Sequence, residues 1–89
     1  MIIGKVVGTV WATRKEKSLE GFKFLVVKHQ TLEGELLRDY SVCVDLVDAG
    51  LGDRVLVVRG SSARQTEQTN KKPVDAIIVG VIDRIDCEV

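Results

Sequence analysis

Two serine hydroxyls and the guanidinium of the second arginine lie close together in the segment RGSSARQT, residues 59–66. Ser61, Ser62 and Arg64 could bind an anion beside the backbone N–H groups of a helix start, and a serine could act as a nucleophile. Ser62 and Gln65 also have the S-x-x-Q spacing of a capping box, which predicts one or two helical turns. A capped corner, in which the preceding glycine turns the chain beside a neighbouring backbone, is the favoured interpretation, and an anion-binding site is the alternative.

Catalytic chemistry finds little support in the rest of the chain. A catalytic serine needs a base and an oxyanion site, and the single histidine, His29, ends a charged segment where we expect it to be solvated. The sequence contains neither a G-x-S-x-G elbow nor a Walker loop. Gly50 and Gly52 form a G-x-G, but the third glycine and the helix of a dinucleotide site are missing. We therefore predict no catalytic residue and no cofactor.

The remaining ionisable candidates are three aspartates and two cysteines. Asp45, Asp75 and Asp83 lie in or beside apolar runs, where a carboxylate could do acid–base chemistry but more often binds the backbone N–H groups of an adjoining loop. We therefore predict that all three anchor loops. Cys43 and Cys87 have neither CxxC spacing nor a nearby histidine cluster, so no metal site is predicted. We expect Cys43 in the core and Cys87 as an exposed thiol.

Charge and composition exclude two classes of partner. The 89 residues carry 13 basic and 13 acidic side chains, so no net field attracts the protein to nucleic acid or to an anionic membrane. Only 4% of the residues are aromatic, which leaves few side chains on which bases could stack. The longest apolar run, residues 76–82, is too short to span a bilayer, and the N-terminus does not resemble a signal peptide. These features favour a cytosolic protein.

Five β-branched runs separated by polar segments position these residues. The predicted strands are residues 2–13, 22–30, 41–47, 54–60 and 74–85. Helical periodicity is absent outside the 59–66 segment, so we predict a single all-β domain over residues 1–89. Its architecture is expected to be a small five-stranded, OB-like barrel with one short helix or helical turn.

Several of these strands are apolar on both faces. The runs FLVV, VLVV and AIIVGVI show no polar alternation, and no predicted helix is long enough to cover the outer face of a barrel. Other copies of the same chain are the simplest cover. The pattern therefore predicts an obligate homo-oligomer in the form of a closed ring.

Four segments in the same order resemble the EutN/CcmL family of bacterial microcompartment vertex proteins. They are GKVVGTVWATRK (4–15), LEGFKFLVV (19–27), VDLVDAGLGDRVLVVRGSSAR (44–64) and PVDAIIVGVID (73–83). The resemblance runs nearly from end to end. One departure lies in the central turn, where the family usually reads Gly-Ala-Gly and this chain has Asp48 in the first place. It affects the conformation and charge of that turn.

The resemblance implies a structural, non-catalytic protein of the bacterial cytoplasm. Homopentamers would occupy the five-fold vertices of a polyhedral shell, and hexameric shell proteins would tile its facets. Polar loops 14–21, 31–40 and 65–72 are candidates for the rim and the exposed faces. The candidates for the subunit contact or the axial opening are Asp48, Ala49, Gly50, Gly52, Gly60, Ser61, Ser62 and Arg64. A small anion- or nucleotide-binding module remains the alternative function, and carboxysome, ethanolamine, propanediol and glycyl-radical compartments all remain open.

Overall fold

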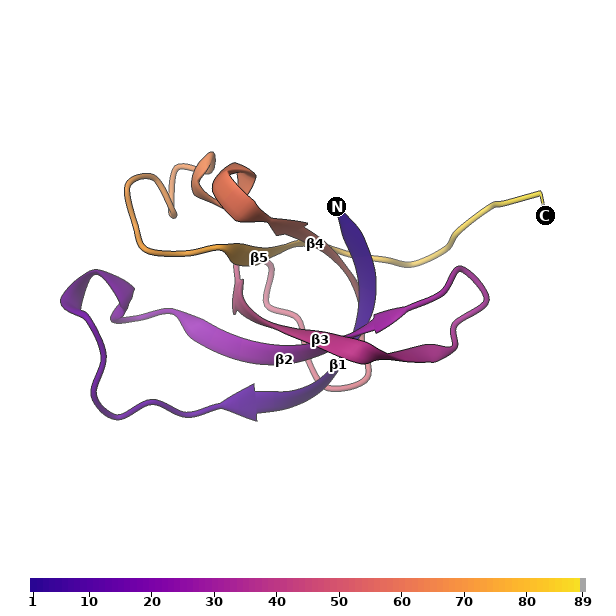
Figure 1. Ribbon diagram of the computed structural model, residues 1–89, viewed down its shortest axis with the longest axis horizontal. Helices are drawn as coiled ribbons and strands as arrows, with labels where there is room; N and C mark the ends of the chain where they lie inside the picture. The colour runs from indigo at the N-terminus through magenta and orange to yellow at the C-terminus, as the bar shows by residue number, and fades with distance from the viewer. Residues whose placement is uncertain (89) are drawn as a thin grey trace.

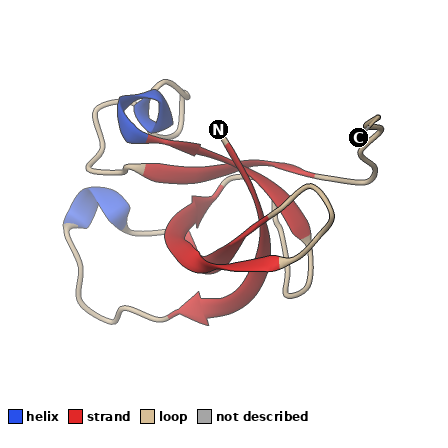
Figure 2. Cartoon of the chain, turned by 45° about the vertical axis from the view of Figure 1, so that its right-hand side comes forward, coloured by secondary structure: helices blue, strands red, loops and turns tan. Residues whose placement is uncertain are grey.

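The computed structural model describes residues 1–88, which fold into a closed β-barrel with two short 3₁₀ helices and no α-helix (Figure 1, Figure 2). The elements in chain order are β1 (Ile2–Val10), η1 (Lys17–Leu19), β2 (Lys23–Gln30), β3 (Leu36–Asp45), β4 (Arg54–Arg59), η2 (Gly60–Arg64) and β5 (Ala76–Val81). The predicted all-β, five-stranded barrel is confirmed. In the described part of the chain, no helix is long and apolar enough to cross a membrane.

The strands follow the order β1-β2-β3-β5-β4 around the barrel, and β1 closes it by pairing with both β2 and β4. The junction between β3 and β5 therefore lies opposite β1. All pairs are antiparallel except β3 with β5, which is parallel and joins only Val44 with Ile77 and Asp45 with Ile78. This junction is the shortest strand pairing of the barrel.

Two glycines allow β1 to curve between its two partner strands. A Cβ atom at Gly4 would overlap the Val27 side chain and would lie 2.6 Å from the carbonyl oxygen of Lys28. Gly8 lies at a β-bulge, where the β1–β2 register shifts between Val6 and Gly8. Gly4 thus marks a close backbone approach, and Gly8 marks a bend in the strand.

The strand boundaries differ from prediction at both ends of the chain and in the middle. The first and last strands end earlier, at Val10 and Val81. β3 begins at Leu36, inside the predicted loop 31–40, because Gln30 pairs with Leu36 and turns the β2–β3 connection into a tight hairpin. Its turn is closed by hydrogen bonds from the Thr31 N–H to the Glu35 carbonyl (3.0 Å) and from the Gly34 N–H to the Thr31 carbonyl (3.0 Å).

The apolar side chains form two clusters rather than one. The inner cluster fills the barrel and consists of Val6, Leu25, Val27, Cys43, Ala49, Val55, Val57, Ala76 and Ile78. The second cluster lies outside, where Val44 and Ile77 of the strands pack against Ala63 and Val74 from the η2 side of the chain. Strands that are apolar on both faces are therefore covered in part by the chain's own loops. On this side, the chain's own loops cover the outer face, where we expected other copies of the chain as the simplest cover.

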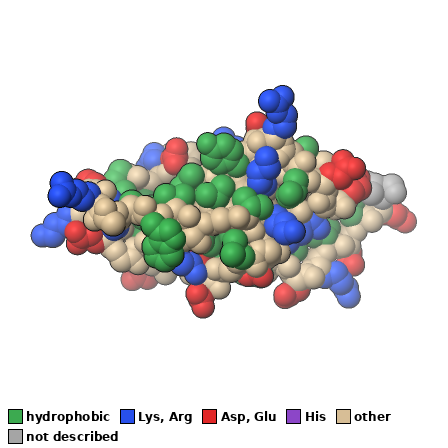
Figure 3. Space-filling view, turned by 90° about the horizontal axis from the view of Figure 1, so that it is seen from below, with side chains coloured by type: hydrophobic (Ala, Val, Ile, Leu, Met, Phe, Trp, Pro, Cys, Tyr) green, Lys and Arg blue, Asp and Glu red, His purple; other side chains and the backbone are tan. Residues whose placement is uncertain are grey.

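Other apolar side chains remain uncovered. Trp11 is 87% exposed, Leu51 71% and Tyr40 62%, and Val7 and Val42 are exposed on their strands. The face seen from below in Figure 3 carries apolar side chains across its middle, with some Lys and Arg side chains among them and further charged side chains around the margin and at the ends. An exposed apolar surface of this kind is typical of an interaction site.

Candidate functional site

The predicted corner begins where β4 ends. Gly60 has φ +68°, and its N–H donates to the Asp75 carbonyl oxygen at 2.8 Å, which ties the start of η2 to the approach to β5. No atom lies within 4 Å of a Cβ built on Gly60. The predicted corner glycine is therefore present, but the reason is its left-handed backbone and not crowding by a neighbouring backbone.

The predicted capping box is wrong. Arg59 occupies the cap position of η2 with no side-chain hydrogen bond, and the Ser62 carbonyl, rather than its hydroxyl, accepts from the Gln65 N–H at 3.1 Å. Because η2 begins at Gly60 and not at Ser62, Ser62 lies in the middle of the helix and not at its cap position.

Two threonine hydroxyls, and not that of Ser62, bind backbone groups of this loop. The Thr66 hydroxyl accepts from the Thr69 N–H at 3.0 Å, and the Thr69 hydroxyl donates to the Ala63 carbonyl at 2.6 Å. Thr69 is fully buried. Sequence reasoning missed this pair, although its T-x-x-T spacing is a local signal for a side-chain-closed turn.

Arg64 acts within the chain. Its guanidinium donates from Nη1 to the Val74 carbonyl at 3.2 Å, which fastens η2 to the segment before β5. Ser61 and Ser62 are exposed, whereas Ala63 is buried. Because the Arg64 guanidinium already donates to the Val74 carbonyl, this contact favours a structural role for Arg64 over the anion-binding alternative.

The central turn is anchored by Asp45 and Lys23. The Asp45 carboxylate, whose side chain is 1% exposed, accepts from the N–H groups of Val47 (3.1 Å) and Ala49 (2.9 Å). Lys23 Nζ lies 3.3 Å from the Asp45 carboxylate and donates to the Ala49 carbonyl at 3.0 Å. The Asp45 carboxylate therefore anchors this loop. Ala49, a candidate for the subunit contact or the axial opening, is buried.

Asp48 has φ +57°, in the left-handed region that favours glycine. Its side chain is almost fully exposed, and its carboxylate lies 3.4 Å from Lys23 Nζ. Desolvation lowers the pKa of Lys23, but the hydrogen bonds to Asp45 and Asp48 outweigh it, so the net shift is upward. The amine therefore stays charged while it bridges the two carboxylates.

The end of the same turn lies along β1. Gly52, with φ +85°, donates from its N–H to the Val6 carbonyl at 2.9 Å. The Gly50 N–H donates to the Asp53 carboxylate at 2.8 Å. Gly50 and Gly52 are exposed beside the uncovered Leu51, which places this stretch on the outer surface next to β1.

The other two aspartates do not anchor loops. Asp75 and Asp83 are exposed, and within residues 1–88 neither carboxylate has a hydrogen-bond partner. Only the backbone carbonyl of Asp75 takes part in the corner, through Gly60. The predicted anchoring role is wrong for these two side chains, because β5 ends before Asp83 and the corner is closed through main-chain atoms.

The histidine is buried, contrary to expectation. His29 is 8% exposed, and its Nε2 lies 2.8 Å from the Ser41 hydroxyl on the adjacent strand. Among the described residues, no carboxylate orients the imidazole and no group of three or more His, Cys, Asp or Glu side chains comes together. The pair therefore bridges β2 and β3 without the third member of a catalytic triad.

Both cysteine predictions are confirmed. Cys43 is fully buried in the barrel, and Cys87 is exposed. Burial raises the pKa of the Cys43 thiol to about 12, so the thiol is protonated at neutral pH and is a poor nucleophile.

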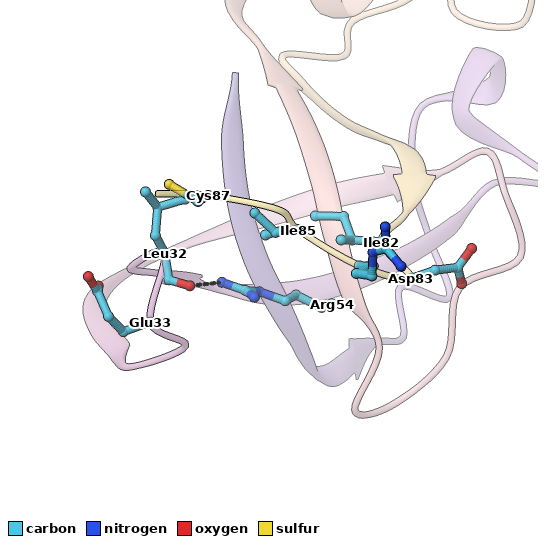
Figure 4. Close-up of a pocket in the computed structure, with 8 residues that line it drawn as sticks. Leu32, Glu33, Arg54, Ile82, Asp83, Ile85 and Cys87 are labelled. Atoms are coloured by element: carbon cyan, nitrogen blue, oxygen red, sulfur yellow. Dashed lines mark hydrogen bonds between the residues drawn. The ribbon is translucent and has the colours of Figure 1, made fainter. Parts of the chain in front are cut away.

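One hollow of about 320 Å³ lies between the 31–35 hairpin and the residues that follow β5. Figure 4 shows Arg54 reaching from the barrel toward Leu32, with Ile82, Ile85 and Cys87 from the chain end beside it. Arg54 Nη2 donates to the carbonyls of Thr31 (2.8 Å) and Leu32 (3.1 Å). Through these hydrogen bonds, the Arg54 guanidinium holds the 31–35 hairpin against the barrel.

A family model described as "Ethanolamine utilisation protein EutN/carboxysome" matches residues 1–83. The carboxysome shell vertex protein CcmL of Synechococcus elongatus is 46% identical over 88 residues, which cover 99% of this chain and 89% of that protein. The microcompartment shell vertex protein GrpN of Rhodospirillum rubrum is also 46% identical over 88 residues, with 97% of each chain covered.

Solved structures agree with the sequence matches. Gloeobacter violaceus CcmL superposes with a TM-score of 0.94 at 44% identity, covering 99% of this chain and 91% of that one. The GrpN pentameric microcompartment shell protein from Rhodospirillum rubrum gives a TM-score of 0.91 at 42% identity, covering 99% and 100%. The proteins that match this chain are structural shell proteins and not enzymes. The chain belongs to the EutN/CcmL family of bacterial microcompartment shell vertex proteins.

Proposed function

We propose that this chain forms homopentamers that close the five-fold vertices of a microcompartment shell in the bacterial cytoplasm. The observation that carries the proposal is the nearly complete coverage between this chain and vertex proteins of the family, one of which is a pentameric shell protein. The exposed apolar side chains of β1, β3 and the central turn support it, because a single barrel leaves them in water.

The mechanism is geometric. Hexagonal units tile a flat sheet, and a closed polyhedron requires five-fold points, so a pentamer works by its shape and by the fit of its rim. Hexameric shell proteins are the proposed partners at the facet edges. Polar loop residues at positions 14–21 and 65–72, together with the 31–35 hairpin, remain candidates for the rim.

The burial of individual residues reduces the set of candidates for the subunit contact. Asp48, Gly50, Gly52, Gly60, Ser61 and Ser62 are exposed and remain candidates for the subunit contact or the axial opening. Ala49 is buried, and Arg64 is bonded to Val74 within the chain, so these two support the loops that carry the candidates.

Native mass spectrometry of the purified chain tests the formation of the pentamer, with five chains as the expected assembly. Electron microscopy of a strain that lacks the protein tests its role in closing the shell. Facet proteins should then form open sheets or elongated tubes, because only the five-fold closure is missing. A monomer at micromolar concentration, or closed shells in a strain with no second vertex protein, contradicts the proposal.

A further inference from the structure

The far side of the barrel from β1 carries an open strand edge. β3 is ten residues long but pairs with β5 only at Val44 and Asp45. The Leu46 N–H donates to the Ile78 carbonyl at 3.4 Å, which shows which edge of this chain segment faces β5. Backbone groups of alternate residues share one edge, so the N–H and C=O groups of Val42 and Tyr40 face the same side. Within residues 1–88 they have no strand partner there.

A groove runs along this open edge. It consists of two hollows that share Val42, Asp75 and Ala76 and that we call together the β3 groove. One hollow, of about 240 Å³, is apolar and is lined by Leu19, Phe24, Val44, Pro73 and Val74. The other, of about 210 Å³, is polar and adds Tyr40, Ser41 and Arg59. The groove can therefore take an apolar side chain at one end and polar backbone along the other.

The same chain carries a segment of matching chemistry. The β1–β2 ladder ends with the pair Val10 and Phe24, and Trp11–Thr13 continues outside any strand. The Trp11 side chain is 87% exposed, and tryptophan is among the residues most enriched in the energetic centres of protein interfaces. Two basic residues, Arg14 and Lys15, follow the segment. The β3 groove holds both Arg59 and the exposed Asp75 carboxylate, which forms no ion pair in the described chain and could receive one of these basic residues.

A ring requires two different complementary surfaces on each subunit, because its contacts are head to tail. The end of β1 and the open edge of β3 are two different surfaces on either side of β2, because Val10 pairs with Phe24 and Phe24 pairs with Val44. We propose that the Trp11–Thr13 segment of one copy docks in the β3 groove of the next, with its indole in the apolar hollow and its backbone along the open edge of β3. This inference rests on the proposed ring assembly and specifies its subunit contact.

Substitutions with matched controls test the contact. Trp11→Ala and Val42→Arg should each raise the concentration at which the ring dissociates by about tenfold or more, as expected for the centre of an interface. Leu32→Ala removes another exposed apolar side chain, in the hairpin between β2 and β3 and outside the proposed contact, and Val81→Arg places the same charge on a strand valine of similar exposure, 41% against 45% for Val42. Both controls should assemble like the wild type, as measured by light scattering coupled to size exclusion.

Mixing gives a sharper result. Trp11→Ala retains an intact groove, and Val42→Arg retains an intact Trp11 segment, so the two variants together can make one contact but cannot close a ring. Native mass spectrometry of the mixture should show a dimer with one copy of each variant, whereas each variant alone stays monomeric at the same concentration. Absence of this mixed dimer, with both variants folded by circular dichroism, overturns the proposal.

Amide exchange of the wild-type ring covers the case in which the variants do not fold. The N–H groups of Tyr40 and Val42 face the groove, so they should exchange slowly only if a neighbouring copy covers them. Rapid exchange of both overturns the docking, and slow exchange supports it. A wild-type chain that is not a ring contradicts the proposed function itself, whereas a ring that is insensitive to Trp11→Ala and Val42→Arg contradicts only this contact.

Discussion

Lys23 and Asp45 lie 3.3 Å apart beneath the central turn, and the carboxylate also receives two backbone N–H groups from that turn. The Asp45 side chain is 1% exposed, whereas that of Lys23 is 43% exposed, so the acid is buried and the base reaches it from the surface. Because the carboxylate is desolvated, its hydrogen bonds to the turn matter more for stability than the solvent-screened ion pair does. This arrangement fixes the link between β3 and β4.

Replacing the buried carboxylate by an amide tests this balance. Asp45→Asn leaves one acceptor oxygen for two N–H groups and removes the charge, so we expect the free energy of unfolding to fall by about 2 kcal/mol. Denaturant titration at fixed protein concentration measures it. Asp83→Asn is the matched control on an exposed aspartate and should change stability by less than about 0.5 kcal/mol. Equal effects at the two positions would show that Asp45 does not anchor the turn.

The left-handed backbone of Asp48 makes a second prediction. Asp48→Gly removes the cost of a side chain at φ +57° and loses only an exposed ion pair with Lys23. We expect stability equal to the wild type or higher by up to about 1 kcal/mol. Asp48→Ala loses the same ion pair without relieving the backbone, so it should be less stable than Asp48→Gly. Thermal unfolding of the two variants side by side checks the order, and the reverse order would contradict this explanation.

Gly60→Val should be the most damaging change in the 59–66 segment. A β-branched residue at φ +68° is strained whatever space surrounds it, so we expect a loss of about 2 kcal/mol or more. Gly60→Asn is the comparison, because asparagine tolerates the left-handed region. Native mass spectrometry and denaturant unfolding should rank the wild type first, Asn next and Val last. An unaltered assembly and stability for Gly60→Val would contradict the corner interpretation.

The serine and threonine hydroxyls of the same loop should differ sharply. Thr69→Val keeps the shape of a buried side chain but removes the hydrogen bond to the Ala63 carbonyl, which should cost about 1–3 kcal/mol. Ser62→Ala removes an exposed hydroxyl that caps nothing, so we expect a change within about 0.5 kcal/mol. Denaturant unfolding of both variants gives the comparison. A larger loss for Ser62→Ala would restore the capping role that the sequence suggested.

The two thiols should also behave differently. Cys87 should react at once with a thiol reagent at pH 8, whereas Cys43 should react only after unfolding, because it is buried and burial raises its pKa to about 12. The unfolded thiol ionises near pH 8.5, so the contribution of Cys43 is fully present below that pH and is lost as the pH rises toward 12. Between pH 8 and pH 10, the free energy of unfolding should therefore fall more in the wild type than in Cys43→Ala, as denaturant titrations at the two pH values would measure.

Features set by local conformation could be read from the sequence. Gly60 was predicted as a corner, although the predicted reason was a neighbouring backbone and not its positive φ. Asp45 was predicted as a loop anchor because aspartate binds nearby N–H groups. Five β-branched runs separated by turn residues likewise predicted five strands, and the quoted family segments predicted the vertex fold. The corner, the loop anchor and each strand depend on residues within a few positions of one another, whereas the family resemblance depends on segments along the whole chain.

The remaining features depend on which strands meet. β3 extends back to Leu36 because β2 offers a partner there, although residues 31–40 read as a polar loop. His29 is buried because Ser41 lies beside it across the β2–β3 ladder, and Ile77 is buried because η2 and Val74 fold over the outside of the barrel. The open edge of β3 exists because β5 meets it at only two residues. A local pattern states which residues prefer to be extended or buried, but cross-strand register and loop placement are long-range contacts that exist only once the barrel has closed.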